Sequence, residues 1–179
     1  MRPIVIFAAL PLLPSMLALG CASKPVDLGD EGVRQQIALL MPSKINIVGP
    51  FTRFRSFDDD DIPDGVELLL QPVNSFGDPV NIAGHVIVEL YAFRQASGDP
   101  KGEKLEQWDI PLLTEKDQRA HWNRTTTMYE FQLQLNPAAI PPNHKYVLLV
   151  TYNTPLEEHM FAEYVMEVPL SARAAVTSG

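Results

Sequence analysis

The sequence predicts an all-β protein: an antiparallel β-sandwich of about seven strands, with a short N-terminal helix and one short crossover helix. From residue 44 onward, apolar and polar residues alternate with a period of two, as in strands that bury one face. Turn residues recur between the alternating segments, which is typical of sandwiches. Sixteen prolines and ten glycines favour many short elements, because proline disrupts helix interiors and central strands.

Seven segments carry the strand pattern. The clearest covers residues 128–135, where every second side chain is apolar, so one face is expected in the core and the other in water. The expected strands are residues 44–48 continuing through 51–57, then 66–73, 85–93, 105–110, 126–135, 146–153 and 160–168.

Two segments have helical character instead. In residues 30–40, apolar side chains recur at i, i+4 and i+7 on one face, and Pro42 ends the segment. Between Thr114 and Asn123, residues 115–122 are expected to form a short amphiphilic helix that crosses between the sheets, with Trp122 docked onto the core.

The first twenty residues have the architecture of a secretory leader. Arg2 supplies a positive charge, residues 4–19 form an apolar run, and the small Gly20 precedes Cys21. A permanent membrane helix needs about 20 apolar residues, whereas this run is shorter and contains two prolines. The leader interpretation therefore prevails.

Residues 17–21, Leu-Ala-Leu-Gly-Cys, resemble the bacterial lipobox, in which a signal peptidase cuts before a cysteine that carries the lipid. The match departs from the commonest pattern, because Ala18 and Leu19 stand where a leucine and a small residue are usual. Cys21 is the only cysteine of the chain. The resemblance implies fatty acylation of Cys21, for example with palmitate, and durable anchoring, which needs more than one acyl chain. An ordinary leader that ends near residue 22 or 23 and leaves a free thiol is the alternative.

These features divide the chain into four expected parts. Residues 1–20 are the leader, 21–43 a lipidated tether with the short helix, 44–171 the sandwich domain, and 172–179 a disordered tail.

The formal net charge of −8 makes nucleic acid an improbable partner and leaves membrane attachment to the lipid. The expected location is the cell envelope, and Ala22, by resemblance to enterobacterial lipoproteins, favours the outer membrane.

A second resemblance lies late in the chain. Residues 135–150 contain a proline-rich turn followed by Lys-Tyr and aliphatic residues, and they resemble the entry into a late strand of immunoglobulin-like and fibronectin-type-III-like domains. In such domains a tyrosine at this point often forms a tyrosine corner, a role that Tyr146 would have here. An ordinary core aromatic is the equal alternative for Tyr146. The whole chain resembles small bacterial lipoproteins that carry such a sandwich.

The acidic residues 56–67 resemble the calcium loop of thrombospondin type 3 repeats. Calcium prefers six to eight oxygen ligands, which alternating carboxylates and a final glutamate supply. The resemblance implies four ligands: Asp58, Asp60, Asp64 and Glu67. Ser56 stands where the first aspartate is usual, and Asp61 replaces the turn glycine. We therefore expect a solvated acidic turn, with a structural calcium ion as the alternative, and no other cofactor.

No enzymatic motif is present in the sequence. Its four histidines are scattered, and it has neither a Gly-x-Ser-x-Gly elbow nor a glycine-rich phosphate loop. Pairs of glutamates, such as 157–158 or 163 and 167, are expected on outward faces of strands.

These observations predict a binding or structural module of the envelope rather than an enzyme. An unidentified envelope protein would contact the turn at residues 76–79, the aromatics Tyr91 and Phe93, or an exposed strand edge. The alternatives are a periplasmic accessory or carrier protein that holds a small ligand between the sheets and, less favoured, a hydrolase.

Overall fold

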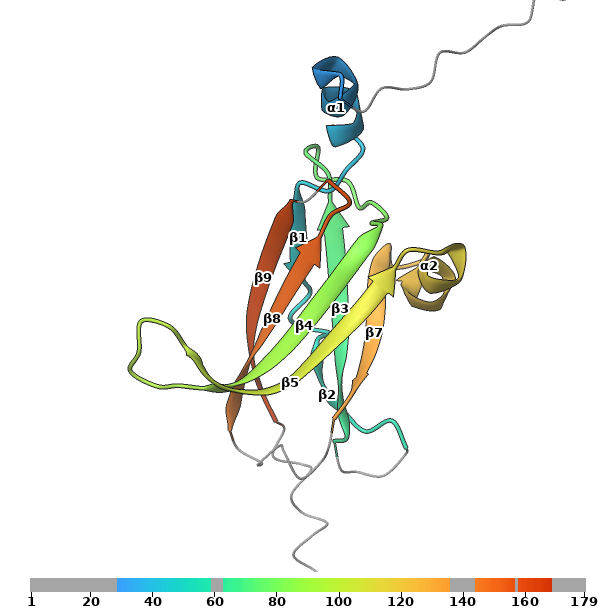
Figure 1. Ribbon diagram of the computed structural model, residues 1–179. Helices are drawn as coiled ribbons and strands as arrows, with labels where there is room; N and C mark the ends of the chain where they lie inside the picture. Colours follow the sequence, from blue (N-terminus) through green and yellow to red (C-terminus); the bar gives the residue numbers. More distant parts are fainter. Residues whose placement is uncertain (1–28, 59–62, 136–143, 157, 169–179) are drawn as a thin grey trace, which may run out of the picture.

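The structure is a computed structural model that describes residues 29–58, 63–135, 144–156 and 158–168. Two helices and nine strands make up this part of the chain (Figure 1). In chain order they are α1 (Glu31–Ala38), β1 (Lys44–Ile47), β2 (Arg53–Arg55), β3 (Gly65–Val73), β4 (Gly84–Phe93), β5 (Lys101–Leu112), α2 (Glu115–His121), β6 (Trp122–Asn123), β7 (Met128–Gln134), β8 (Lys145–Asn153) and β9 (His159–Glu167).

The strands form two antiparallel sheets that pack face to face, which confirms the predicted sandwich. Sheet A has the order β1-β3-β7-β6, with β2 also paired to β3, and sheet B has the order β5-β4-β8-β9. Immunoglobulin constant-type domains place strands A, B, E and D in one sheet and C, F and G in the other. In sheet A, the strands β1, β3, β7 and β6 follow the order A, B, E and D. In sheet B, the strands β4, β8 and β9 follow the order C, F and G, and β5 is an additional strand beside β4.

The predicted strand over residues 44–57 is in fact two strands. Ile45 and Phe54 are both buried in the core, at 2% and 4% exposure, but an odd separation cannot place both on one face of a continuous strand. The chain bulges between them, so that residues 48–52 stand opposite only two residues of β3. The buried Thr52 closes the bulge, because its hydroxyl accepts a hydrogen bond from the backbone N–H of Leu69 at 3.1 Å.

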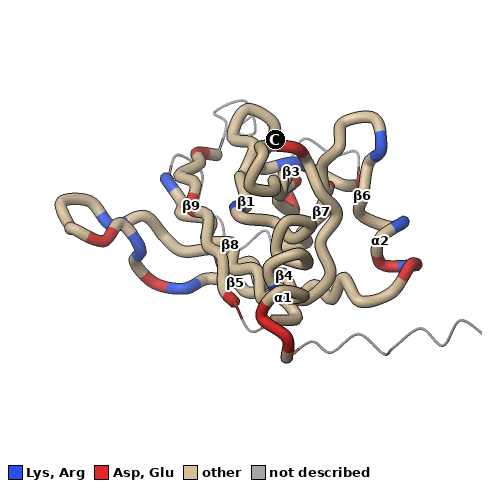
Figure 2. The backbone as a smooth tube through the Cα atoms, turned by 90° about the horizontal axis from the view of Figure 1, so that it is seen from above, with Lys and Arg blue, Asp and Glu red and all other residues tan. Residues whose placement is uncertain are grey.

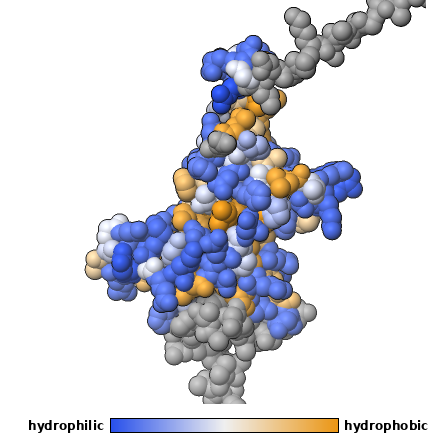
Figure 3. Space-filling model, viewed as in Figure 1, coloured by the Kyte–Doolittle hydropathy of each residue, from blue (hydrophilic) through white to orange (hydrophobic). Residues whose placement is uncertain are grey.

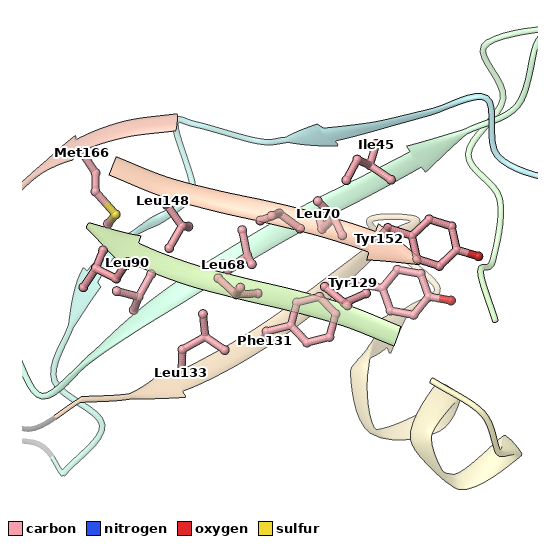
Figure 4. Packing of buried hydrophobic residues seen from close by; sticks show 14 of the residues in the cluster. Ile45, Leu68, Leu70, Leu90, Tyr129, Phe131, Leu133, Leu148, Tyr152 and Met166 are labelled. Atoms are coloured by element: carbon pink, nitrogen blue, oxygen red, sulfur yellow. The ribbon is translucent and has the colours of Figure 1, made fainter. Parts of the chain in front are cut away.

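The core lies between the two sheets and is filled by aliphatic and aromatic side chains from both (Figure 4). Its largest members are aromatic, and the rings of Tyr129 and Phe131 stack at 5.9 Å. Along β7 the buried Tyr129, Phe131 and Leu133 alternate with residues that are more exposed. The alternation that predicted this strand is thereby confirmed.

The crossover helix α2 begins where predicted, at Glu115, and ends one residue before the predicted end at Trp122. It begins at a capping box, in which Thr114 and Asp117 each bond the other's backbone N–H. The helix ends at His121 because Trp122 and Asn123 turn extended and pair with β7. The Trp122 ring lies 4.9 Å from that of Tyr129 and packs on the core, as predicted.

The β4–β5 hairpin projects beyond the rest of the sandwich (Figures 1 and 2). Strand β5 begins at Lys101, four residues before the predicted start. Irregular register on either side of Tyr91 bends the hairpin. Lys101 then pairs with Asp99 at 2.8 Å and with Glu163 of β9 at 2.9 Å, and these contacts raise the pKa of Lys101. The ion pair with Glu163 therefore links the hairpin to β9, the strand at the opposite edge of sheet B.

Candidate functional site

The structure does not gather the sequence-predicted residues into one site. Cys21, the leader and Asp60 lie outside the described residues. Asp58 and Asp64 flank the turn between β2 and β3, Glu67 lies on β3, and Tyr146 lies at the start of β8.

Glu67 is held by two arginines of the neighbouring strand. Its carboxylate lies 3.4 Å from Nε of Arg53 and 2.7 Å from Nη1 of Arg55. The Asp64 carboxylate accepts the backbone N–H of Phe57 at 2.8 Å. These engagements do not fit a bidentate calcium ligand at Glu67. Within the described part of the chain, no group of three or more His, Cys, Asp or Glu could hold a metal, and calcium binding stays a prediction.

Tyr146 occupies the position expected of a tyrosine corner, at the start of β8. Its side chain is buried, and its ring packs edge-on against Phe54 with the centroids 5.2 Å apart. Burial raises the pKa of Tyr146. The corner itself stays a prediction, because residues 136–143 of the preceding turn lie outside the described residues.

The β3–β4 turn presents Phe76 to solvent. The Asn74 side chain accepts the backbone N–H groups of Phe76 and Asp78, at 2.9 and 3.0 Å. Gly77 adopts a φ of 89°, a conformation that favours glycine. The Phe76 side chain is 73% exposed on this closed turn. The other predicted contact residues, Tyr91 and Phe93, are half-buried on the outer face of β4.

Two more exposed apolar residues lie at the same end of the molecule. Leu39 and Leu40 follow α1 and are 51% and 78% exposed. The segment that contains them joins the sandwich at Ser43, whose N–H donates to the carbonyl of Val73 at 2.8 Å. Val73 is the last residue of β3, and the turn that carries Phe76 follows it directly. We call α1, Leu39, Leu40 and the 74–79 turn the α1 end; Figure 1 shows it at the top of the sandwich, and Figure 3 shows hydrophobic surface just below α1.

The sequence indicated only half of the α1 end. The turn at residues 76–79 was expected to be a contact surface, whereas the apolar residues of the helix were expected on one face without any indication of what that face contacts. In the structure, α1 buries none of its residues. The spacing of the apolar residues therefore predicted the helix, but it did not predict that these residues would stay uncovered.

The surface also carries two grooves that are open to solvent, each of about 490 Å³. One is lined by polar and charged residues of α2 and its neighbours, together with Trp122. The other runs between the 48–52 bulge and β9, beside Tyr164. The second groove lies at the edge where the two sheets meet, outside the packed core in which a carrier protein would hold its ligand.

Two of the histidines, His85 and His159, share a cross-strand row on sheet B, on either side of Asn153. His85 Nδ1 lies 3.0 Å from the carboxylate of Asp109, and His159 Nδ1 lies 2.7 Å from the Asn153 side-chain oxygen. No local pattern indicates this row, since its members are brought together by strand pairing alone.

Comparison with known proteins adds no family to this picture: no family model matches the chain, and no similar sequence is found among curated proteins. In the residues that the structure describes, no helix has both the length and the apolar character needed to cross a bilayer.

Proposed function

We propose that this chain is a bacterial lipoprotein, cut before Cys21 and held in the cell envelope by lipid on that residue. Its sandwich is a binding or structural module, attached to the membrane by the anchor and to an envelope protein by its surface. The observation that carries the proposal is the leader that ends in Leu-Ala-Leu-Gly-Cys, with the only cysteine of the chain at the cleavage point.

The position of α1 supports this proposal. Chain from the cysteine enters the domain through α1, at one end of the sandwich (Figure 1). Attachment at an end leaves both outer sheet faces and the β4–β5 hairpin free for contact with a partner. A fold of this kind serves many functions, so the partner has to be found by experiment.

The packing between the sheets favours a structural or surface-binding module over a carrier. Tyr129, Tyr146 and Tyr152, together with Phe131, fill that space with side chains that are at most 2% exposed. A carrier for a small ligand would instead need an apolar cavity of several hundred Å³.

Metabolic labelling tests the proposal. Bacteria that express the full chain are grown with labelled palmitate, beside bacteria that express a Cys21→Ser variant. We expect label on the wild-type protein and none on the variant, which should also keep its leader and migrate as a larger species. Mass spectrometry of the N-terminal peptide then identifies the acylated residue. An unacylated N terminus beyond residue 21 in the wild type would refute the proposal.

A further inference from the structure

We infer that the α1 end is a second membrane contact, in which α1 lies on the bilayer surface and Leu40 and Phe76 enter its interfacial region. This inference rests on the proposed lipid anchor at Cys21. The apolar side chains of the α1 end therefore contact the boundary between lipid headgroups and acyl chains, and not another protein.

The first argument is the character of α1. Val33 and Ile37 are four residues apart and lie on one side of the helix. Leu40, the next member of this apolar row, follows in the turn after Ala38, where α1 ends. Val33 and Ile37 are only half-buried, and Leu40 is 78% exposed. The sandwich therefore leaves this apolar row largely uncovered. An amphipathic helix whose apolar row is not covered by its own domain can lie in a membrane interface, with the row about 5–10 Å deep.

The second argument is the length of the tether. Glu31, the first residue of α1, is the tenth residue after Cys21. Even fully extended, a chain of ten residues spans at most about 36 Å. A lipid on Cys21 would hold α1 this close to the bilayer. At the resulting effective concentration, a weak apolar contact suffices for occupancy.

The third argument is the charge of the α1 end. Within it, the acidic Glu31 and Asp78 outnumber the single basic residue, Arg34. Anionic lipid would repel this surface weakly, so the contact has to come from apolar side chains rather than from basic ones. The contact should therefore form on neutral phosphatidylcholine and should persist at high salt.

Depth-dependent fluorescence quenching tests the contact. The acylated full-length protein, purified from membranes, is reconstituted in phosphatidylcholine vesicles whose acyl chains carry bromine. Phe76→Trp reports on the α1 end. Phe51→Trp is the matched control, because Phe51 is also exposed, at 58%, but lies farther from the α1 end. Its neighbour Thr52 bonds to Leu69 of β3. Leu69 lies four residues, or about 13 Å, before Val73, where β3 reaches the α1 end.

We expect the added tryptophan to be quenched about twofold more at position 76 than at position 51, since only the first reaches the interface. Adding Leu40→Ser to Phe76→Trp should lower the quenching, whereas adding Leu113→Ser should not. Leu113 is 60% exposed but lies beside α2.

Co-flotation with the vesicles separates the two proposals. Flotation with equal quenching at positions 76 and 51 would overturn the membrane contact and leave the anchor standing. Equal quenching together with a doubled mass in detergent would assign the apolar surface to a second copy. Failure to float would overturn the anchor, and the contact with it.

Discussion

The hydroxyl of Tyr129 donates a hydrogen bond to Oε1 of Gln118 at 2.6 Å, which joins the crossover helix α2 to the centre of sheet A. The same hydroxyl accepts the backbone N–H of Ile82 at 2.9 Å. Nε2 of Gln118 donates to the carbonyls of Ile82 and Leu112, at 2.6 and 3.1 Å. Two side chains thus hold α2, the β3–β4 connection and the end of β5 together.

Tyr129→Phe should lower the free energy of unfolding by about 1–3 kcal/mol, because it removes the hydroxyl that pairs with the Ile82 N–H and with Oε1 of Gln118. Urea denaturation measures the loss. Tyr164→Phe is the control, since the Tyr164 hydroxyl bonds to none of the residues that the structure describes. Equal losses in the two variants would show that the network adds nothing beyond ring packing.

Thr52→Val should destabilise the bulge between β1 and β2. The substitution keeps the shape of the side chain but removes the acceptor for the Leu69 N–H in a buried position. We expect a loss of about 1–3 kcal/mol in the free energy of unfolding. Thr52→Ser keeps the hydroxyl and should recover most of that loss. If serine and valine were equally harmful, the methyl group rather than the hydrogen bond would be responsible.

Tyr152 should make the fold sensitive to alkaline pH. Burial raises the pKa of Tyr152 to about 12, aided by the nearby Tyr129. The protonated hydroxyl donates a hydrogen bond to the carbonyl of Ala83 at 2.8 Å. In the unfolded chain a tyrosine loses its proton near pH 10. Between about pH 10 and about pH 12 the unfolded state therefore binds fewer protons than the folded state, and stability falls as pH rises.

Comparing wild type with Tyr152→Phe isolates this effect. Below about pH 10 the wild type should be more stable, because it keeps the bond to Ala83. The advantage should shrink above that pH by up to about 1.4 kcal/mol per pH unit. Urea titrations at several alkaline pH values measure it. A difference that stays constant with pH would mean that Tyr152 titrates normally.

Chelation of calcium should not change the melting midpoint. The Glu67 carboxylate is already paired with Arg53 and Arg55, and Asp64 is bonded to the backbone of its own turn. We expect the same thermal midpoint with excess calcium and with a chelator. A midpoint several degrees higher in calcium, lost again in Asp64→Asn, would instead establish the predicted metal site.

Period-two alternation carried most of the fold prediction. It placed β3, β4, β7, β8 and β9 to within two residues, because each of these strands faces the core on one side. It missed the first four residues of β5 because they belong to the projecting hairpin. These residues include Lys101, Glu103 and Lys104, so they show no alternation of apolar and polar side chains. The break between β1 and β2 was detectable, since Ile45 and Phe54 cannot share a face without it.

The candidate site was harder to predict than the fold. Local patterns identified Phe76 on its turn and the apolar row of α1, but only the packed domain shows that this row stays uncovered. The Tyr129–Gln118 network has no local pattern, because its members come from three separate segments. Sequence patterns therefore identified elements and turns, and tertiary contacts decided which side chains face solvent.

Trp108 protects an open edge of sheet A. β7 pairs with β6 only at Tyr129 and Met128, so its edge is uncovered from Glu130 to Gln134. The indole Nε1–H of Trp108 donates to the carbonyl of Gln134 at 3.1 Å. His121 Nδ1 lies 3.3 Å from the carbonyl of Glu130, which fits a tautomer with the proton on Nδ1. Unpaired edges promote association between chains, so these side chains oppose it.

Trp108→Phe removes the indole donor and should free the Gln134 carbonyl for pairing with a second chain. We expect faster growth of light scattering on heating below the melting midpoint, with a loss of about 0.5–1.5 kcal/mol in the free energy of unfolding. Trp122→Phe is the matched control, because the Trp122 indole packs on Tyr129 and donates to none of the described residues. If both variants aggregated at the same rate, the edge of β7 would be protected by something other than the Trp108 hydrogen bond.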